Sequence, residues 1–124
     1  MKFENVTVDL ISNIYFDGNV TSRNIFFSDG SLKTLGVMLK GEYEFKTSKK
    51  EIMEISSGEM HVLIPNSKDW NIFKENTSFE IPANSSFKVK IKKITNYCCS
   101  YIDYQSLEYN KEFNFFMSVV LLLF

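Results

Sequence analysis

The residues Phe87-Lys88-Val89-Lys90-Ile91-Lys92 alternate between apolar and charged side chains without a break. Because successive side chains of a β-strand point to opposite faces, this stretch predicts a strand with one buried and one solvated face. The residues from 37 to 45 are predicted as a second such strand, with Tyr43 and Phe45 on its apolar face. Three further stretches alternate in the same way: Glu51, Met53 and Ile55; Met60, Val62 and Ile64; and Tyr97, Cys99 and Tyr101.

Turn-forming residues separate these stretches, as at Asp29-Gly30, at Ser57-Gly58 and in the segment 82–86. Strands at intervals of about 8–12 residues, with such turns between them, are typical of a β-sandwich or barrel. The sequence shows no amphipathic helix of useful length, and its 12 Phe and 6 Tyr residues favour pleated, half-buried surfaces. Because 124 residues fit one domain, we predict a single all-β domain.

Charge and cysteine content limit the partners and the compartment. The formal net charge is -1, and glutamates are interleaved with the lysines, which argues against nucleic acid or a membrane surface as partner. Cys98 and Cys99 are adjacent, and a disulfide between neighbours is strained. We expect two reduced thiols in a cytoplasmic protein, because the N-terminus also lacks the apolar stretch of a signal peptide.

The pattern changes after Asp103, where a polar stretch leads into an apolar run at residues 113–124. A membrane-spanning helix needs about 20 apolar residues, so this run predicts no membrane span. An extra strand, a helix packed on the barrel, a sticky appendage and a membrane tether all remain open. We divide the chain into a barrel, residues 1–103, and an apolar C-terminal extension of unknown role, residues 104–124.

A series of short motifs occurs in a fixed order along residues 13–102. They are Tyr15-Phe16, Gly18, Val20, KTLGVM at 33–38, Gly41-Glu42-Tyr43, Phe45, Thr47, Glu51, Met53, Ser57-Gly58, VLIP at 62–65, Asp69-Trp70, FEIPANSSF at 79–87 and YCCSY at 97–101. Taken together, they resemble the small bacterial pyrimidine/purine nucleoside phosphorylases of cupin fold. The resemblance implies a cupin-type jelly roll or β-barrel that acts as a homodimer. It also implies a reaction in which inorganic phosphate splits purine and pyrimidine nucleosides into ribose 1-phosphate and free base.

Two features depart from the family pattern. Asn76 stands where the family has glycine, and asparagine tolerates the left-handed backbone better than most residues. We therefore expect the turn at this position to be kept. The extension from about Tyr104 lies outside the pattern altogether.

The sequence predicts a site without a metal or other cofactor, apart from phosphate as co-substrate. His61 is the only histidine, whereas many cupins bind a metal through several histidines and a carboxylate. A lone histidine between alternating neighbours is more often a surface or packing residue.

Phosphate requires hydrogen-bond donors and positive charge. Lys33, inside the family pattern, is the first candidate, and Arg23, the only arginine, is the second; a merely solvated Lys33 is the alternative. The turn Asn84-Ser85-Ser86 offers amide, hydroxyl and backbone N–H donors, which can form an anion site or an ordinary turn.

Nucleoside binding is expected to involve aromatic side chains and one carboxylate. Tyr43, Tyr97 and Tyr101 should face the interior, where they either stack on a base or pack the core. Trp70 would cover the barrel mouth or only plug it. Glu51 shares the face of Met53 and can bind ribose hydroxyls, transfer a proton or pair with an interior lysine.

The resemblance thus implies a pentosyltransferase, for which we predict Lys33 and Glu51 as the catalytic residues. Cys99 is interpreted as a buried small apolar side chain. The rival hypothesis is a non-catalytic cupin that binds or senses a small metabolite, because the same barrel pattern fits it equally well.

Overall fold

The computed structural model describes residues 1–102, and nearly all of the chain in that range lies in or between antiparallel strands. The strands are β1 (Thr7–Val8), β2 (Asn13–Tyr15), β3 (Val20–Phe26), β4 (Leu32–Met38), β5 (Gly41–Lys46), β6 (Lys50–Ser57), β7 (Glu59–Leu63), β8 (Asn71–Lys74), β9 (Ser78–Ile81), β10 (Ser86–Ile91) and β11 (Thr95–Ile102). One short 3-10 helix, η1 (Phe16–Gly18), follows β2. The predicted all-β fold is confirmed, and the predicted extension at 104–124 lies outside the described residues.

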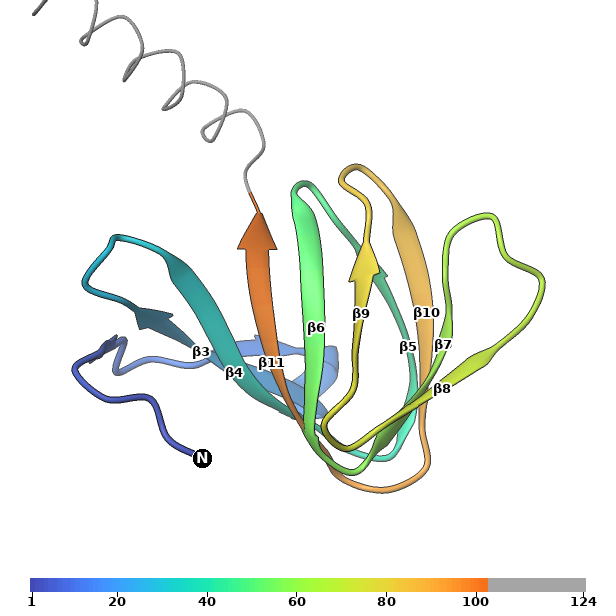
Figure 1. Cartoon of the computed structure of the whole chain (residues 1–124). Helices are drawn as coiled ribbons and strands as arrows, with labels where there is room; N and C mark the ends of the chain where they lie inside the picture. Colours follow the sequence, from blue (N-terminus) through green and yellow to red (C-terminus); the bar gives the residue numbers. More distant parts are fainter. Residues whose placement is uncertain (103–124) are drawn as a thin grey trace, which may run out of the picture.

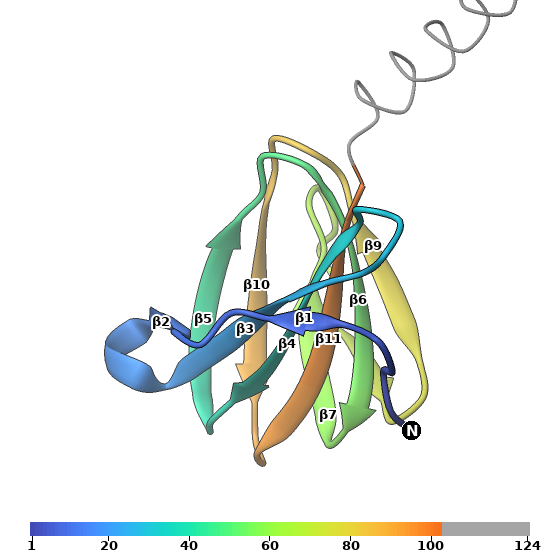
Figure 2. The same cartoon turned by 90° about the vertical axis from the view of Figure 1, so that its left-hand side faces the viewer.

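Two antiparallel sheets pack face to face around one core (Figures 1 and 2). Sheet A has seven strands in the order β1-β3-β4-β11-β6-β9, with β2 also paired to β3. Sheet B has four strands in the order β5-β10-β7-β8. Side chains from the inner faces of both sheets belong to the same hydrophobic cluster, as in a sandwich or jelly roll.

The alternation in the sequence correctly assigns most inner faces. In β10, Phe87, Val89 and Ile91 are fully buried, and the lysines between them face outward. In β6, Met53 and Ile55 are buried on the inner face. Burying such a side chain contributes about 1.5–3 kcal/mol, so these strands are fixed in register by their apolar faces.

The prediction of one continuous strand over residues 37–45 is wrong. β4 ends at Met38 and β5 begins at Gly41, and the turn between them carries the chain from sheet A to sheet B. The turn is held by the Leu39 backbone, whose N–H donates to the Asn19 carbonyl at 2.8 Å and whose carbonyl accepts the Tyr43 hydroxyl at 2.6 Å. The turn changes the phase of the alternation, so Met38 is buried inside whereas Val37 faces outward.

The turn at Asn76 follows the prediction. Its φ is 63°, in the left-handed region that asparagine tolerates, and its N–H donates to the Ile55 carbonyl at 2.8 Å. The glycine of the family pattern is therefore replaced without loss of the turn.

The two ends of the sandwich are filled differently. At the end where β4 turns into β5 and β10 leads to β11, the lower end in Figure 1, Val20, Met38 and Met60 are completely buried. At the opposite end, β11 finishes, β6 begins and β9 turns into β10 (Figure 1). There Phe45, Ile64 and Tyr101 pack on the core but stay half-buried. We call this the upper end.

Candidate functional site

Polar side chains gather on the inner face of sheet A toward its upper end. In the strand register, Glu51 of β6 lies opposite Tyr101 of β11, and Thr34 of β4 lies opposite Cys99 of β11. The Thr34 and Tyr101 hydroxyl oxygens are 3.2 Å apart. Three neighbouring strands therefore place a carboxyl, a phenol and an alcohol on the inner face of the sheet.

Glu51 is the acid–base group of this cluster. Burial raises the pKa of its carboxyl to about 7, and a hydrogen bond with Cys99 lowers it only in part. A carboxyl with a pKa near 7 can both give and take a proton at neutral pH, which is the property required of a general acid or base.

Tyr97 continues the polar surface toward β3. Its ring lies over Gly36, and its hydroxyl donates to the Thr21 carbonyl at 3.4 Å. Ser22 also hydrogen-bonds the phenol, and the Asn13 side-chain amide donates to Ser22 Oγ at 3.1 Å. Burial raises the pKa of Tyr97 and of Tyr101 above the ordinary tyrosine value, so both phenols stay neutral hydrogen-bonding groups. We call Ser22, Thr34, Glu51, Tyr97 and Tyr101 the polar wall.

Aromatic rings dominate the facing side of the interior. Phe45 and Phe87 are stacked with ring centroids 5.4 Å apart, and Tyr43 lies 6.2 Å from Phe45. The ring centroids of Phe87 and Phe79 are 6.3 Å apart, and those of Phe79 and Phe73 are 4.5 Å apart. We call Tyr43, Phe45 and Phe87 the aromatic wall; Tyr43 and Phe87 belong to the same core cluster as Tyr97.

The arrangement suits a flat aromatic ligand that also carries hydroxyl groups. The aromatic wall offers stacking faces that do not distinguish one heteroaromatic ring from another. The polar wall offers hydroxyls for hydrogen bonding, and Glu51 supplies an exchangeable proton. Three of the predicted site residues, Glu51, Tyr97 and Tyr101, thus lie together on the polar wall. Tyr43 lies on the aromatic wall, where its hydroxyl donates to the Leu39 carbonyl.

Lys33 does not join them. It precedes inward-facing Thr34 by one position in β4, so it lies on the outer face, opposite Ile25 of β3 in the register. Its Nζ is 5.7 Å from the ring centroids of both Phe3 and Phe27. The structure therefore separates Lys33 from Glu51 by the thickness of the sheet.

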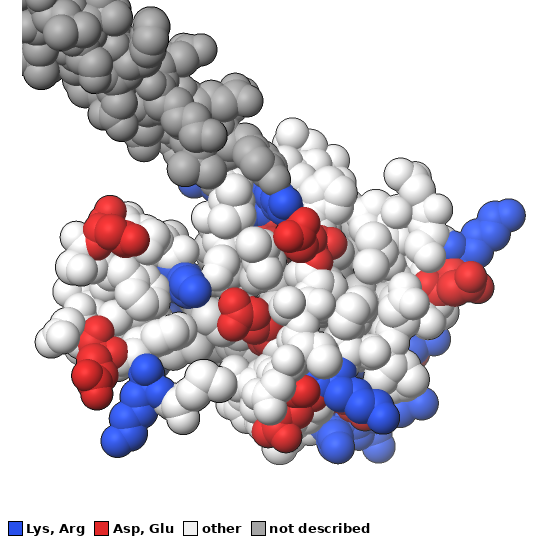
Figure 3. Space-filling model, in the orientation of Figure 1, with Lys and Arg blue, Asp and Glu red and all other residues white. Residues whose placement is uncertain are grey.

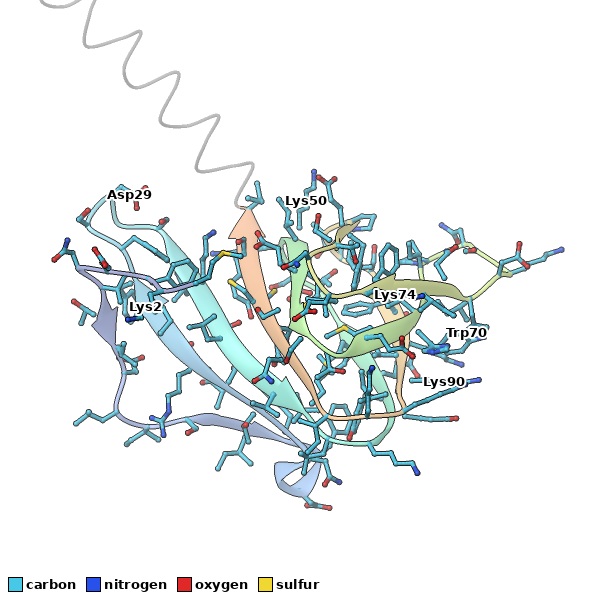
Figure 4. All side chains as sticks on the ribbon, turned by 60° about the horizontal axis from the view of Figure 1, so that its bottom comes forward. Lys2, Asp29, Lys50, Trp70, Lys74 and Lys90 are labelled. Carbon is cyan, nitrogen blue, oxygen red and sulfur yellow. The ribbon has the colours of Figure 1, made fainter. Side chains whose placement is uncertain are left out.

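Trp70 also lies apart from the polar wall. Its ring is 4.2 Å from Nζ of Lys90, whose side chain projects from the outer face of β10 (Figure 4). Lys90 lies opposite His61 in the register, and His61 Nε2 is 3.5 Å from a Glu59 carboxylate oxygen without forming a hydrogen bond. Trp70 and His61 thus lie on the outer face of sheet B, where Nε2 of His61 is buried.

The turn Asn84-Ser85-Ser86 is placed at the upper end, three residues after Ile81, the register partner of Glu51. Its polar groups are mostly paired within the turn region. Ser85 N–H donates to Thr47 Oγ1 at 3.0 Å, and Ser85 Oγ donates to the Ala83 carbonyl at 3.1 Å. Asn84, with a φ of 53°, and Ser86 are both exposed, so the Asn84 amide and the Ser86 hydroxyl remain available to a ligand.

The remaining candidate cation and metal ligands form no second site. Arg23 lies beside a shallow depression of about 270 Å³ on the outer face of sheet A, where Nη1 donates to the Leu10 carbonyl at 2.6 Å. Within residues 1–102, no group of three or more His, Cys, Asp and Glu side chains is placed to hold a metal. On the face shown in Figure 3, acidic and basic side chains are interspersed rather than gathered into a patch of one sign.

Sequence reasoning missed Thr34 and Phe16. Thr34 had a signal, because it directly follows the candidate Lys33 in the motif at 33–38, but the phase of that strand was misread. Phe16 contacts the aromatic wall, with its ring 5.0 Å from Tyr43, although it lies outside the strands. Among the described residues, no helix is long and apolar enough to cross a membrane.

The chain is similar to proteins of one named family. The family model described as pyrimidine/purine nucleoside phosphorylase matches residues 10–101. A protein of that name from Sulfurovum sp. (strain NBC37-1) is 57% identical over 101 residues, covering 82% of this chain and 98% of the relative. Another, from Leptospira interrogans, is 54% identical and covers 82% of this chain and 95% of the relative.

Solved structures support the fold. A protein of unknown function from Acinetobacter sp. ADP1 superposes with a TM-score of 0.80 at 40% identity, covering 82% of this chain and 98% of that one. An RmlC-like cupin from Shewanella frigidimarina has a TM-score of 0.60 at 14% identity, covering 82% and 86%, which confirms the predicted cupin-type architecture. The chain belongs to the pyrimidine/purine nucleoside phosphorylase family.

Proposed function

We propose that the chain is a nucleoside phosphorylase of broad specificity, a pentosyltransferase that forms ribose 1-phosphate and free base from purine and pyrimidine nucleosides. The family match and the relatives' names support the reaction class. The observation that carries the proposal is Glu51, a half-buried carboxyl with a pKa of about 7 on the inner face of the barrel.

In the proposed reaction, a phosphate oxygen forms a bond to C1′ of the sugar while the C1′–N bond to the base breaks. The bonding electron pair leaves with the base, and positive charge develops on the sugar. Protonated Glu51 gives its proton to the departing base, which makes the base a better leaving group. The carboxylate that remains lies close to the developing positive charge and stabilises it.

In this proposal the aromatic wall binds the base and the polar wall binds the sugar. The base stacks on Phe45 and the neighbouring rings, and the stacking faces accept either base class. The sugar hydroxyls pair with Thr34, Tyr101 and Tyr97.

Phosphate enters from the upper end, where the Asn84 amide and the Tyr101 hydroxyl supply donors. Lys33 takes no part in this proposal, because it lies on the outer face of sheet A. No cofactor is included besides phosphate as co-substrate.

The proposal is tested by incubating the chain with inosine or uridine, each with and without inorganic phosphate. We expect hypoxanthine and uracil to be released only in the presence of phosphate. Binding of nucleosides without release would favour the rival, a non-catalytic cupin that senses a small metabolite.

We further propose that the chain forms a homodimer through the segment around β2. Leu10, Ile11 and Ile14 are 92%, 84% and 67% exposed, and this segment projects from the barrel (Figure 2). Such a run of exposed apolar side chains marks an interaction site. A second copy is the occupant we propose, because the same segment on both copies gives a self-complementary contact.

Replacing Leu10 and Ile11 together by lysine is expected to convert the dimer to monomers, because it places charges in the apolar contact. Light scattering would then give the mass of one chain instead of two. Ile94→Lys is the matched control, since Ile94 is also exposed but lies in the β10–β11 loop at the lower end. A wild-type chain that is monomeric at micromolar concentration would contradict the proposal.

We propose a cytoplasmic location on the basis of the two cysteines. Cys98 and Cys99 are both buried free thiols, which suits a reducing cytoplasm.

A further inference from the structure

Phe16 lies between β2 of sheet A and β5 of sheet B, two strands that form no backbone hydrogen bonds with each other. We call this boundary between the two sheets the seam. β5 is an edge strand of sheet B, and β2 pairs with β3 of sheet A. η1, which carries Phe16, follows β2, and in Figure 2 this segment lies beside β5. The Phe16 ring contacts Tyr43 at 5.0 Å and Phe45 at 5.5 Å, edge to face in the second case. Phe16 therefore extends the aromatic wall across the seam.

The backbone that places this ring is in an unfavourable conformation. Phe16, Asp17 and Gly18 have φ values of 51°, 55° and 91°, a run of three left-handed residues. Glycine adopts this region without cost, whereas for a bulky residue such as Phe16 it is an outlier. Strain of this kind persists only where surrounding contacts enforce it, and it is concentrated at functional sites.

The surrounding contacts tie the turn to the aromatic wall. Asn19 N–H donates to the Phe16 carbonyl at 3.0 Å, and Leu39 N–H donates to the Asn19 carbonyl at 2.8 Å. The Leu39 carbonyl accepts the Tyr43 hydroxyl at 2.6 Å. The position of Phe16 is thus coupled through two turns to the ring that it touches.

Phe16 nevertheless remains 43% exposed. Exposure alone does not distinguish Phe16, because other large apolar side chains of this chain are also exposed. Phe16 differs in that a left-handed backbone holds its accessible ring against Tyr43 and Phe45, where the ring can meet a ligand that lies along the aromatic wall.

We propose that Phe16 is a base-binding residue, which forms the side wall against which the nucleobase packs. The proposal rests on the proposed function and adds to it the edge of the base subsite. Because stacking acts on the face of any nucleobase, loss of this ring should weaken binding of both base classes, and of the larger purines more.

The test measures KM for inosine, uridine and phosphate in Phe16→Leu and Phe16→Tyr. We expect Phe16→Leu to raise the nucleoside KM about tenfold, with the phosphate KM unchanged, and Phe16→Tyr to restore wild-type values. Phe3→Leu is the matched control, because Phe3 is 40% exposed and contacts Phe27 at 5.0 Å, on the outer side of sheet A. Equal effects of Phe16→Leu and Phe3→Leu, or a parallel rise of the phosphate KM, would overturn the proposal.

A glycine variant separates binding from folding. Phe16→Gly removes the ring but relieves the positive φ, so its thermal unfolding midpoint should be no lower than that of Phe16→Leu. Its nucleoside KM should be raised just as much. A nucleoside KM that returns to the wild-type value in Phe16→Gly would show that the ring acts through the fold.

A direct binding measurement distinguishes failure of this proposal from failure of the proposed function. Hypoxanthine is titrated into wild-type chain and Phe16→Leu by calorimetry, without turnover. Weaker binding to Phe16→Leu supports the base subsite even if no phosphate-dependent release is found. If wild type releases base but wild type and Phe16→Leu bind hypoxanthine with equal affinity, the role proposed for Phe16 is rejected and the proposed function is kept.

Discussion

Glu51→Gln is expected to lower kcat for phosphate-dependent base release by about 100-fold or more, because an amide cannot give a proton to the departing base. Glutamine keeps the size of the side chain and its hydrogen-bonding capacity, so binding should change less than kcat. The measurement is the initial rate of base release at saturating nucleoside and phosphate. A Glu51→Gln protein with wild-type kcat would remove Glu51 from the mechanism.

The pH dependence of the rate provides a second readout of Glu51. Its carboxyl is mostly protonated below a pH of about 7, because burial raises its pKa to about that value. If the neutral form is the proton donor, kcat should be constant in mild acid and fall as the pH rises through about 7. The residual rate of Glu51→Gln should lack this fall.

Protein stability should follow the same titration, with a defined sign. Burial raises the folded-state pKa of Glu51 from the ordinary value of 4.5 to about 7, so the folded state binds more protons between these two values. The stabilisation from the protonated group is fully present below about pH 4.5 and is lost as the pH rises through about 7. At pH 8, Glu51→Gln should therefore unfold at no lower a temperature than wild type. This control shows that the loss of rate is not caused by unfolding.

Gly36→Ala is expected to destabilise the fold by about 3 kcal/mol, which would lower the thermal midpoint by about 10 °C or more. A Cβ at this position would lie 2.5 Å from the Cζ and hydroxyl oxygen of Tyr97. It would also meet the backbone carbonyl oxygen of Thr21. Neither neighbour can move freely, since Thr21 belongs to the paired strand β3 and Tyr97 is buried. The midpoint would be measured by calorimetry.

Two further variants isolate the cause. Gly30→Ala, in the β3–β4 turn, has a positive φ but open space around its Cβ, so it should cost less than Gly36→Ala. Adding Tyr97→Leu to Gly36→Ala should recover part of the lost stability, because it removes one of the two clashes. Equal midpoints for Gly36→Ala and wild type would contradict the packing of Tyr97 over β4.

The sequence predicts much of the fold because period-two alternation depends directly on which face of a strand is buried. It placed Glu51, Tyr97 and Tyr101 on inner faces, and the structure confirms those orientations. It failed at the turn between Met38 and Gly41, where no proline or Asn-Gly pair marks the change of phase. If residues 33 to 45 formed one unbroken strand, the side chains of Lys33 and Tyr43 would lie on the same face. The turn between Met38 and Gly41 shifts the alternation, so Lys33 lies on the outer face instead.

Other features of the site depend on contacts that local sequence does not encode. The role proposed for Phe16 depends on its left-handed backbone and on contacts with rings about 30 positions away in the sequence. Trp70 lies in a connection without periodicity, so nothing in the sequence assigned it to the outer side, next to Lys90. The pKa of Glu51 likewise arises from burial between strands.

Product balance is the most direct test of the central claim, that this barrel interior carries out phosphorolysis. The purified chain is incubated with inosine and phosphate, and hypoxanthine, ribose 1-phosphate and free ribose are quantified together. We predict one ribose 1-phosphate for each hypoxanthine, no free ribose, and a loss of both products in Glu51→Gln. Release of hypoxanthine with free ribose, or no release at all from the wild-type chain, would contradict the account.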